Sequence, residues 1–137
     1  MKTQSHSAIA GARFIERWHR LETGVRCAYN PEQPNAIRCW LSLGEHLVRK
    51  GWADAAEVHR RMLRVLLAAA NDEALPWFWR SVCLEHVNLP QARLTSMLAL
   101  RQPLAAQAVE SAVQQARERL PVFPLAPAAD NEGSGEP

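Results

Sequence analysis

The stretch from Asn35 to Ala70 constrains the fold more than any other part of the chain, because two helical patterns flank one glycine, Gly51. Apolar residues spaced three and four apart lie on one helix face. Before Gly51 these residues are Ala36, Trp40, Leu43 and Leu47, and after it they are Ala55, Val58, Met62, Leu66 and Ala69. Lys50 and Gly51 are typical of a helix C-terminus, where a cation lies near free carbonyls and glycine accepts the left-handed conformation. Since one or two residues remain for the turn, the sequence predicts an antiparallel helical hairpin.

This hairpin matches part of the tetratricopeptide pattern, in which Trp-x2-Leu-Gly is followed by a turn glycine and an alanine. The matching residues are Trp40, Leu43, Gly44, Gly51 and Ala56. Gly44 and Ala56 are small, so the two helices can approach closely, and Trp40 fills the wider end. The match is partial, since Arg60 stands where the repeat usually has an aromatic residue and Leu63 where it usually has alanine. The alternative is an ordinary helical hairpin that matches by chance.

Length and composition indicate a single globular domain. The chain has 137 residues, of which 47% are hydrophobic and 22% charged, and this length can enclose a sizeable core. The longest apolar run, Val65 to Ala70, is far too short to span a bilayer. We therefore expect no membrane association, and the N-terminal residues show no secretory signal.

Charge and cysteine content restrict the range of possible compartments and partners. Three cysteines, an odd number, do not form a disulfide framework and favour a reducing cytoplasm. The net charge is +2, and the arginines are spread along the chain rather than clustered. This distribution does not indicate a nucleic-acid footprint.

Apolar spacing predicts further helices on both sides of the hairpin. A first helix of about residues 8–28 carries the stripe Phe14, Trp18, Leu21 and Val25. Prolines interrupt the pattern at residues 31 and 34, and Asn35 can cap the next helix. Asp72 or Glu73 suits the start of a fourth helix, with Pro76 in its first turn. Prolines also start the fifth and sixth predicted helices, of about residues 90–100 and 103–120.

The predicted fold class is all-α, with about six antiparallel helices in a tetratricopeptide-like right-handed stack. The helical domain covers residues 8–120, after a flexible N-terminus of residues 1–7. Residues 121–137 are rich in proline and acid, so we expect them to be disordered. Their early part, Val122 to Leu125, could pack back on the domain.

Three aromatic residues follow one another in the fourth predicted helix: Trp77, Phe78 and Trp79. They cannot all point the same way on a helix, so at least one should be partly exposed or meet a partner. Another helix of the same chain could instead cover it. If the cluster is exposed, the isolated chain should self-associate.

The sequence carries no recognisable catalytic constellation. Cys83 and His86 would share a helix face, but no second pair with ligand spacing complements them, so we predict no metal site. Glu45-His46 and Glu57-x-His59 resemble acid–base pairs only in isolation. No HExxH, glycine-rich phosphate loop or GxSxG motif occurs. We therefore predict a binding module with no cofactor and no catalytic residues rather than an enzyme, and a small enzyme or metal-binding helical protein is the alternative.

Three segments resemble the tetratricopeptide-like chaperone subunit for the needle protein of bacterial type III secretion, of the YscG/PscG type. The first segment is Leu47 to Gly51 followed by the helix that begins with Ala55-Ala56. The second is Trp79 to Glu85, which is similar to the Trp-Leu-Ala-Leu-Cys-Glu stretch of that family. The third comprises Leu94 to Leu98 and the closing Ala116 to Leu120.

This resemblance implies a virulence-associated cytoplasmic chaperone, one half of a heterodimer with a small helical co-chaperone. Together the two proteins hold the amphipathic C-terminal helix of the needle subunit and prevent premature polymerisation. The expected client-helix groove comprises Trp40, Leu43, Leu47, Met62, Trp79, Val82, Cys83, Leu94 and Met97. The expected co-chaperone contact comprises Phe14, Trp18 and Leu21. For each of these residues plain core packing is the alternative. The alternative function is another tetratricopeptide-like adaptor or a class II translocator chaperone.

Overall fold

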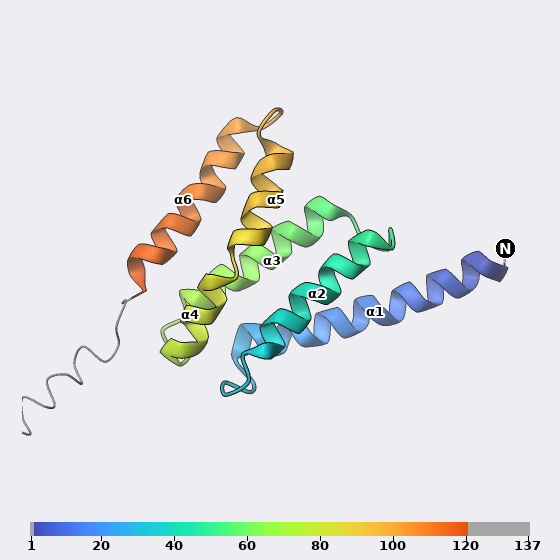
Figure 1. Cartoon of the computed structure of the whole chain (residues 1–137), viewed down its shortest axis with the longest axis horizontal. Helices are drawn as coiled ribbons and strands as arrows, with labels where there is room; N and C mark the ends of the chain where they lie inside the picture. The colour runs from blue at the N-terminus through green and yellow to red at the C-terminus, as the bar shows by residue number, and fades with distance from the viewer. Residues whose placement is uncertain (1, 121–137) are drawn as a thin grey trace, which may run out of the picture.

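The computed structural model describes the backbone of residues 2–120 and the side chains of residues 6–120. Within residues 2–120 the structure contains six α helices and no strand, which confirms the predicted all-α class. The helices are α1 (Lys2–Cys27), α2 (Asn35–Arg49), α3 (Ala55–Ala70), α4 (Trp77–Glu85), α5 (Asn88–Leu98) and α6 (Pro103–Arg119). Apart from α4 and α5, successive helices lie side by side and run in opposite directions (Figure 1). The predicted tail of residues 121–137, including Val122 to Leu125, lies outside the described residues.

Helix α1 is longer than its apolar stripe predicted. It begins at Lys2, so residues 2–7, which were expected to be flexible, belong to the helix. It ends at Ala28, which adopts the left-handed conformation with φ 52°. The N–H of Tyr29 donates to the Gly24 carbonyl at 3.0 Å, the bond expected when a residue in this conformation closes a helix.

The predicted hairpin around Gly51 is present. Gly51 has φ 73°, and the N–H of Trp52 donates to the Leu47 carbonyl at 2.9 Å. Asp54 caps the start of α3, and its carboxylate accepts the Glu57 N–H at 3.0 Å. Glycine can adopt this conformation without a Cβ clash, which explains why the chain turns at this residue.

Two other predicted caps are wrong. The residue that precedes α2 is Pro34, which makes no side-chain cap bond, and Asn35 is the first helical residue. Helix α4 begins only at Trp77, after Pro76. Asp72 instead accepts the Ala74 N–H at 3.0 Å, within the turn that follows α3. In both places a proline fixes where the helix begins, because its restricted φ suits a helix start.

Helix α3 lies at the centre and packs against each of the other five helices. The tightest approach is at Gly44 of α2, where a Cβ atom would overlap the methyl group of Met62 and lie 2.9 Å from Trp18 Nε1. The Trp18 indole donates to the Trp40 carbonyl at 3.0 Å and stacks on the Trp40 ring. The small residue predicted at position 44 therefore brings together three helices rather than two.

Helices α4 and α5 form one bent rod rather than an antiparallel pair (Figure 1). The bend falls at His86 and Val87, which separate the two helices. Pro90 has no N–H to donate to the carbonyl of His86, so the regular helical ladder is interrupted there. The chain therefore reverses direction between successive helices everywhere except between α4 and α5.

The α5–α6 hairpin forms the outer edge of the stack, and its tip extends past the other helices (Figure 1). Helix α6 packs mainly on α5 and less on α3. Its buried residues are small, Val113 and Ala116, which permits a close approach to its neighbours. Within residues 2–120 no helix combines the length and apolarity needed to cross a bilayer.

Candidate binding surfaces

A groove runs between α1 and α2, which we call the α1–α2 groove. Its lining residues are Arg17 and Leu21 of α1, and Arg38, Cys39, Ser42 and Leu43 of α2; its volume is about 530 Å³. Leu21 and Leu43 are half-buried, whereas Arg17 and Arg38 are exposed. Residues four apart on each antiparallel helix face the same side. The result is an apolar floor between two cationic rims.

An aromatic cluster closes one side of the same helix pair. Phe14 of α1 stacks on Trp52, with ring centroids 5.4 Å apart, and meets His46 edge to face at 5.3 Å. The Trp52 indole donates to the Ser7 hydroxyl at 3.1 Å. These contacts tie α1 to the turn that joins α2 and α3. Phe14 therefore packs against residues of its own chain, and only the remainder of its side chain can serve as the predicted co-chaperone contact.

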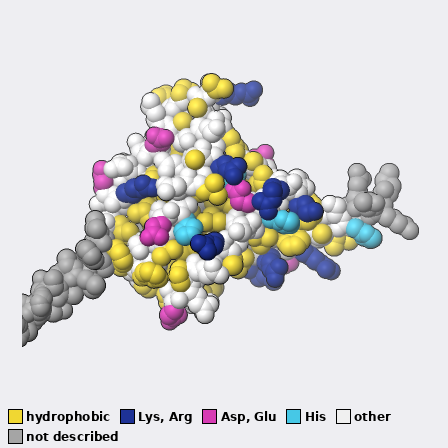
Figure 2. Space-filling view, in the orientation of Figure 1, with side chains coloured by type: hydrophobic (Ala, Val, Ile, Leu, Met, Phe, Trp, Pro, Cys, Tyr) yellow, Lys and Arg dark blue, Asp and Glu magenta, His cyan; other side chains and the backbone are white. Residues whose placement is uncertain are grey.

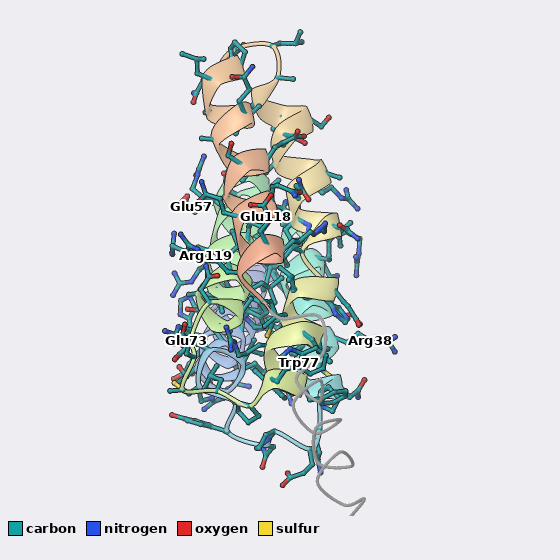
Figure 3. The ribbon with its side chains drawn as sticks, turned by 90° about the vertical axis from the view of Figure 1, so that its left-hand side faces the viewer. Arg38, Glu57, Glu73, Trp77, Glu118 and Arg119 are labelled. Atoms are coloured by element: carbon teal, nitrogen blue, oxygen red, sulfur yellow. The ribbon has the colours of Figure 1, made fainter. Side chains whose placement is uncertain are left out.

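A second, smaller groove lies between the start of α2 and α4. It has a volume of about 250 Å³ and is lined by Pro34, Asn35, Arg38, Val82 and His86. Arg38 borders both grooves, and in Figure 3 its side chain extends away from the helices. Helix α2 therefore borders a groove on either side of the exposed Arg38.

A polar cluster around the buried His59 joins α2, α3 and α5. His59 is 2% exposed, and its Nε2 lies 2.8 Å from a Glu45 carboxylate oxygen. Its Nδ1 lies 2.8 Å from the Ala55 carbonyl oxygen, while the second Glu45 oxygen lies 3.5 Å from Arg93. Both ring nitrogens of His59 therefore face oxygen atoms of the protein that can accept hydrogen bonds.

Sequence reasoning missed the His59–Glu45 pair, since it compared only acidic and histidine residues within two positions of each other along the chain. The predicted hairpin contained the signal, because Glu45 and His59 lie at similar distances before and after Gly51. His59 is enclosed by protein, so the cluster stabilises the packing of three helices and is not placed for acid–base chemistry on a ligand.

The tip of the α5–α6 hairpin exposes large apolar side chains, and we call this set the hairpin tip. Met97 is 40% exposed, Leu104 77% and Leu100 94%. Figure 2 shows several hydrophobic side chains among uncharged polar ones at this end of the molecule. Next to the tip, small side chains leave a shallow groove of about 470 Å³ between α5 and α6. Its lining residues are Ala92, Thr95, Ser96, Ala99, Ala106, Gln107 and Glu110.

The aromatic run in α4 is divided between core and surface. Trp79 is fully buried and donates to the Val25 carbonyl at 2.8 Å, whereas Phe78 is 53% exposed. Trp77 is half-buried and lines a groove with Leu84 and Leu120 at the end of α6 (Figure 3). The prediction that at least one of the three aromatic residues is partly exposed is therefore confirmed.

The predicted client-helix groove does not form one surface. Six of its nine residues are at most 3% exposed and belong to the core: Trp40, Leu47, Met62, Trp79, Cys83 and Leu94. That part of the prediction is corrected, because side chains covered by the chain itself cannot line an open groove. The other three lie apart: Leu43 in the α1–α2 groove, Val82 beside α2, and Met97 at the hairpin tip.

The predicted co-chaperone contact is divided in the same way. Trp18 is 4% exposed and belongs to the core, Phe14 belongs to the aromatic cluster, and Leu21 lines the α1–α2 groove. Apolar periodicity marks the inner face of a helix, but it does not say whether that face meets the same chain or another protein. Hence the most buried residues of the predicted groove and of the predicted co-chaperone contact belong to the core.

In the described part of the chain the cysteines and histidines do not form a metal-binding site. Within that part no group of three His, Cys, Asp or Glu residues could hold a metal ion. Cys83 is buried, and desolvation raises the pKa of its thiol to about 12. The His86 ring bonds to the Val82 carbonyl oxygen at 3.0 Å. Cys83 is thus an unreactive core thiol in the folded protein.

Comparison with protein-family models, curated proteins and solved structures finds no match for the chain. The functional interpretation consequently depends on the surfaces described above, and chiefly on the hairpin tip and the α1–α2 groove.

Proposed function

We propose that this chain is a cytoplasmic chaperone that binds an amphipathic helix of a partner protein at the hairpin tip. The client is the needle subunit of a type III secretion system, held with the help of a small helical co-chaperone. The chaperone keeps the client from polymerising prematurely. The observation that carries the proposal is the exposure of Met97, Leu100 and Leu104 at one end of the molecule.

The hairpin tip has the properties of a helix-binding surface. Leucine and methionine side chains gain free energy when a partner removes them from water, at about 25 cal/mol per Å² of apolar area. Methionine is flexible and adapts to different partner side chains. The small residues of the adjacent α5–α6 groove, such as Ala99 and Ala106, let a third helix approach closely. An amphipathic helix with apolar residues at steps of three and four fits this arrangement.

The choice of client comes from the resemblance of residues 47–56, 79–85, 94–98 and 116–120 to the needle-chaperone family. A subunit built to polymerise must present an apolar helix to its neighbours. Burial of that helix in a chaperone prevents assembly until the subunit is delivered. A chain made of stacked helical hairpins and exposed apolar residues suits this task, and an adaptor of the same architecture with another client is the competing function.

Charged substitutions at the hairpin tip test the proposal. The chain is co-expressed with a needle subunit, and the complex is isolated by size-exclusion chromatography and weighed by analytical ultracentrifugation. We expect Leu100→Glu combined with Leu104→Glu to abolish the complex, with Met97→Glu giving a smaller loss. The helical circular dichroism and the Tm should stay unchanged, because these side chains make few contacts within the chain.

Tyr29→Glu is the matched control, since Tyr29 is 65% exposed and lies in the loop between α1 and α2. This variant should bind the client like the unmodified chain. Retention of the complex by the tip variants would place the binding site elsewhere. If the unmodified chain binds another amphipathic helix but no needle subunit, the adaptor function replaces the proposed one.

A further inference from the structure

Some arginines of this protein pair with carboxylates and others do not. Arg26, Arg60, Arg61 and Arg93 each lie within 3.5 Å of a carboxylate oxygen. Arg13, Arg17, Arg20 and Arg38, on the outer side of α1 and α2, make no ion pair within residues 6–120. Glu16 lies among the α1 members and lines the same surface as Arg13, Arg17 and Arg20. We call these four residues the unpaired arginines, although other exposed arginines, such as Arg64 and Arg101, also make no ion pair within residues 6–120.

Two of the unpaired arginines border the α1–α2 groove from opposite sides. Arg17 belongs to α1 and Arg38 to α2, and half-buried Leu21 and Leu43 lie between them. The remaining lining groups are the Ser42 hydroxyl and the Cys39 thiol. None of the lining residues is acidic, so the charge at the rims is not neutralised within the groove. Each guanidinium presents several N–H donors that match a carboxylate.

We propose that the α1–α2 groove binds an acidic amphipathic helix of a second protein. Its apolar residues cover Leu21 and Leu43, and carboxylates flanking its apolar stripe bond to Arg17 and Arg38. The groove between two antiparallel helices is a natural position for a third helix, because ridges of the third fit between the rows of the first two. Only the role of this second protein rests on the proposed function; the binding of an acidic amphipathic helix does not.

The arrangement of charged side chains determines which charge the partner helix must carry. An acidic helix gains from two exposed guanidinium groups on either side of the apolar floor, whereas a basic helix meets repulsion there. The arginines are exposed, so the attraction should weaken as salt screens it. The apolar floor distinguishes this surface from a simple polyanion site, since nucleic-acid phosphates would make no favourable apolar contact with the two leucines.

A pair of designed peptides tests the charge requirement. Both are helical, about 18 residues or five turns long, with the same leucine stripe; glutamates flank the stripe in one and lysines in the other. Binding to the full chain is measured by fluorescence anisotropy at low and at high salt. We expect the glutamate peptide to bind at least ten times more tightly than the lysine peptide, and less tightly as salt rises.

Substitutions in the chain then locate the site. Arg17→Ala combined with Arg38→Ala should weaken glutamate-peptide binding at least tenfold. Arg64→Ala combined with Arg101→Ala is the matched control, because both side chains are exposed arginines without an ion pair in residues 6–120 and neither lines the groove. The control should bind like the unmodified chain. Equal binding of both peptides, no binding, or equal loss in both double variants would overturn the proposal.

The native cysteines provide an independent footprint. Cys39 is exposed within the groove, Cys27 is exposed at the end of α1 outside it, and Cys83 is buried. Bound glutamate peptide should slow the alkylation of Cys39 at least fivefold and leave the rate at Cys27 unchanged, as read by mass spectrometry. Equal protection of both residues would mean that the peptide does not occupy the groove.

Two further measurements separate this inference from its rivals and from the proposed function. A single-stranded oligonucleotide that binds with the same dependence on Arg17 and Arg38 would replace the helix by a polyanion. The Leu100→Glu and Leu104→Glu variant should bind the glutamate peptide normally, because the hairpin tip is a separate surface. Failure at the tip and failure at the groove can therefore be told apart.

Discussion

The three-helix unit α1–α3 and the α5–α6 hairpin are built from similar helices but are stabilised differently. In α1–α3, Trp18 and Trp40 are buried and stacked, and Glu22 of α1 accepts two hydrogen bonds from Arg61 of α3 at 2.6 and 3.2 Å. The bond to Glu22 raises the pKa of the Arg61 guanidinium. In the α5–α6 hairpin the buried residues are few and mostly small, and Leu100 and Leu104 remain in water.

The difference lies in how much each region contributes to stability. Large side chains that fill a shared interior stabilise α1–α3, while the hairpin leaves Leu100 and Leu104 exposed at its tip and buries, besides Leu94, mainly small side chains. Apolar residues at the tip therefore contribute little to folding and remain free for a partner. Under the proposed function, the same residue types serve folding where neighbouring helices cover them and partner binding where none does.

The strongest test of this contrast is truncation of one large side chain in each region. We expect Trp40→Ala to lower the free energy of unfolding by about 3–5 kcal/mol, because it empties a fully buried site. Leu104→Ala, at an exposed position, should change it by less than about 0.5 kcal/mol. Urea unfolding followed by circular dichroism measures both. A comparable loss in the two variants would show that the hairpin tip is part of the core.

A glycine pair examines the packing of α1–α3 more finely. Gly44→Ala should destabilise the protein by about 1–2 kcal/mol, since its Cβ would meet Met62 and the Trp18 ring, which is held by its bond to Trp40. Gly24→Ala should stabilise by about 0.5–1 kcal/mol, because the helical position has room and alanine is the better helix former. Thermal unfolding compares the two. A stabilised Gly44→Ala variant would mean that the three helices can move apart.

The smallest effect concerns the link between the end of α1 and the turn after α3. Arg26 donates to Asp72 at 2.8 Å, and this bond, with the Ala74 N–H, lowers the pKa of the Asp72 carboxyl. A lowered pKa in the folded state stabilises the protein above the ordinary range of an aspartate. That contribution disappears as the pH falls through the folded-state pKa.

Asp72→Asn should accordingly lower the Tm slightly at pH 7, by less than either substitution above, and leave it unchanged near pH 2. Glu73→Gln, at an exposed neighbouring position without an ion pair in residues 6–120, should leave the Tm unchanged at both pH values. An effect of Asp72→Asn that is equal at both pH values would show that charge is not the cause.

Local patterns predicted the helices well and their ends less well. The turn at Gly51 and the all-α class followed from the spacing of apolar residues and from glycine's backbone freedom. Asn35 and Asp72 were assigned as caps because their side chains can accept helix N–H bonds, yet prolines at positions 34 and 76 determined where α2 and α4 begin. The start of α1 was missed because residues 2–7 carry no apolar stripe.

By itself, the sequence determined that this chain forms stacked helical hairpins with Gly51 at a turn and Gly44 at a close approach, because these properties depend on neighbours along one or two helices. Only the tertiary structure decided which apolar residues are core and which are surface. It enclosed Trp40, Trp79 and Leu94 and left Leu100 and Leu104 exposed. Exposure depends on which helices cover a face, and that is a property of the whole assembly of helices rather than of any one of them.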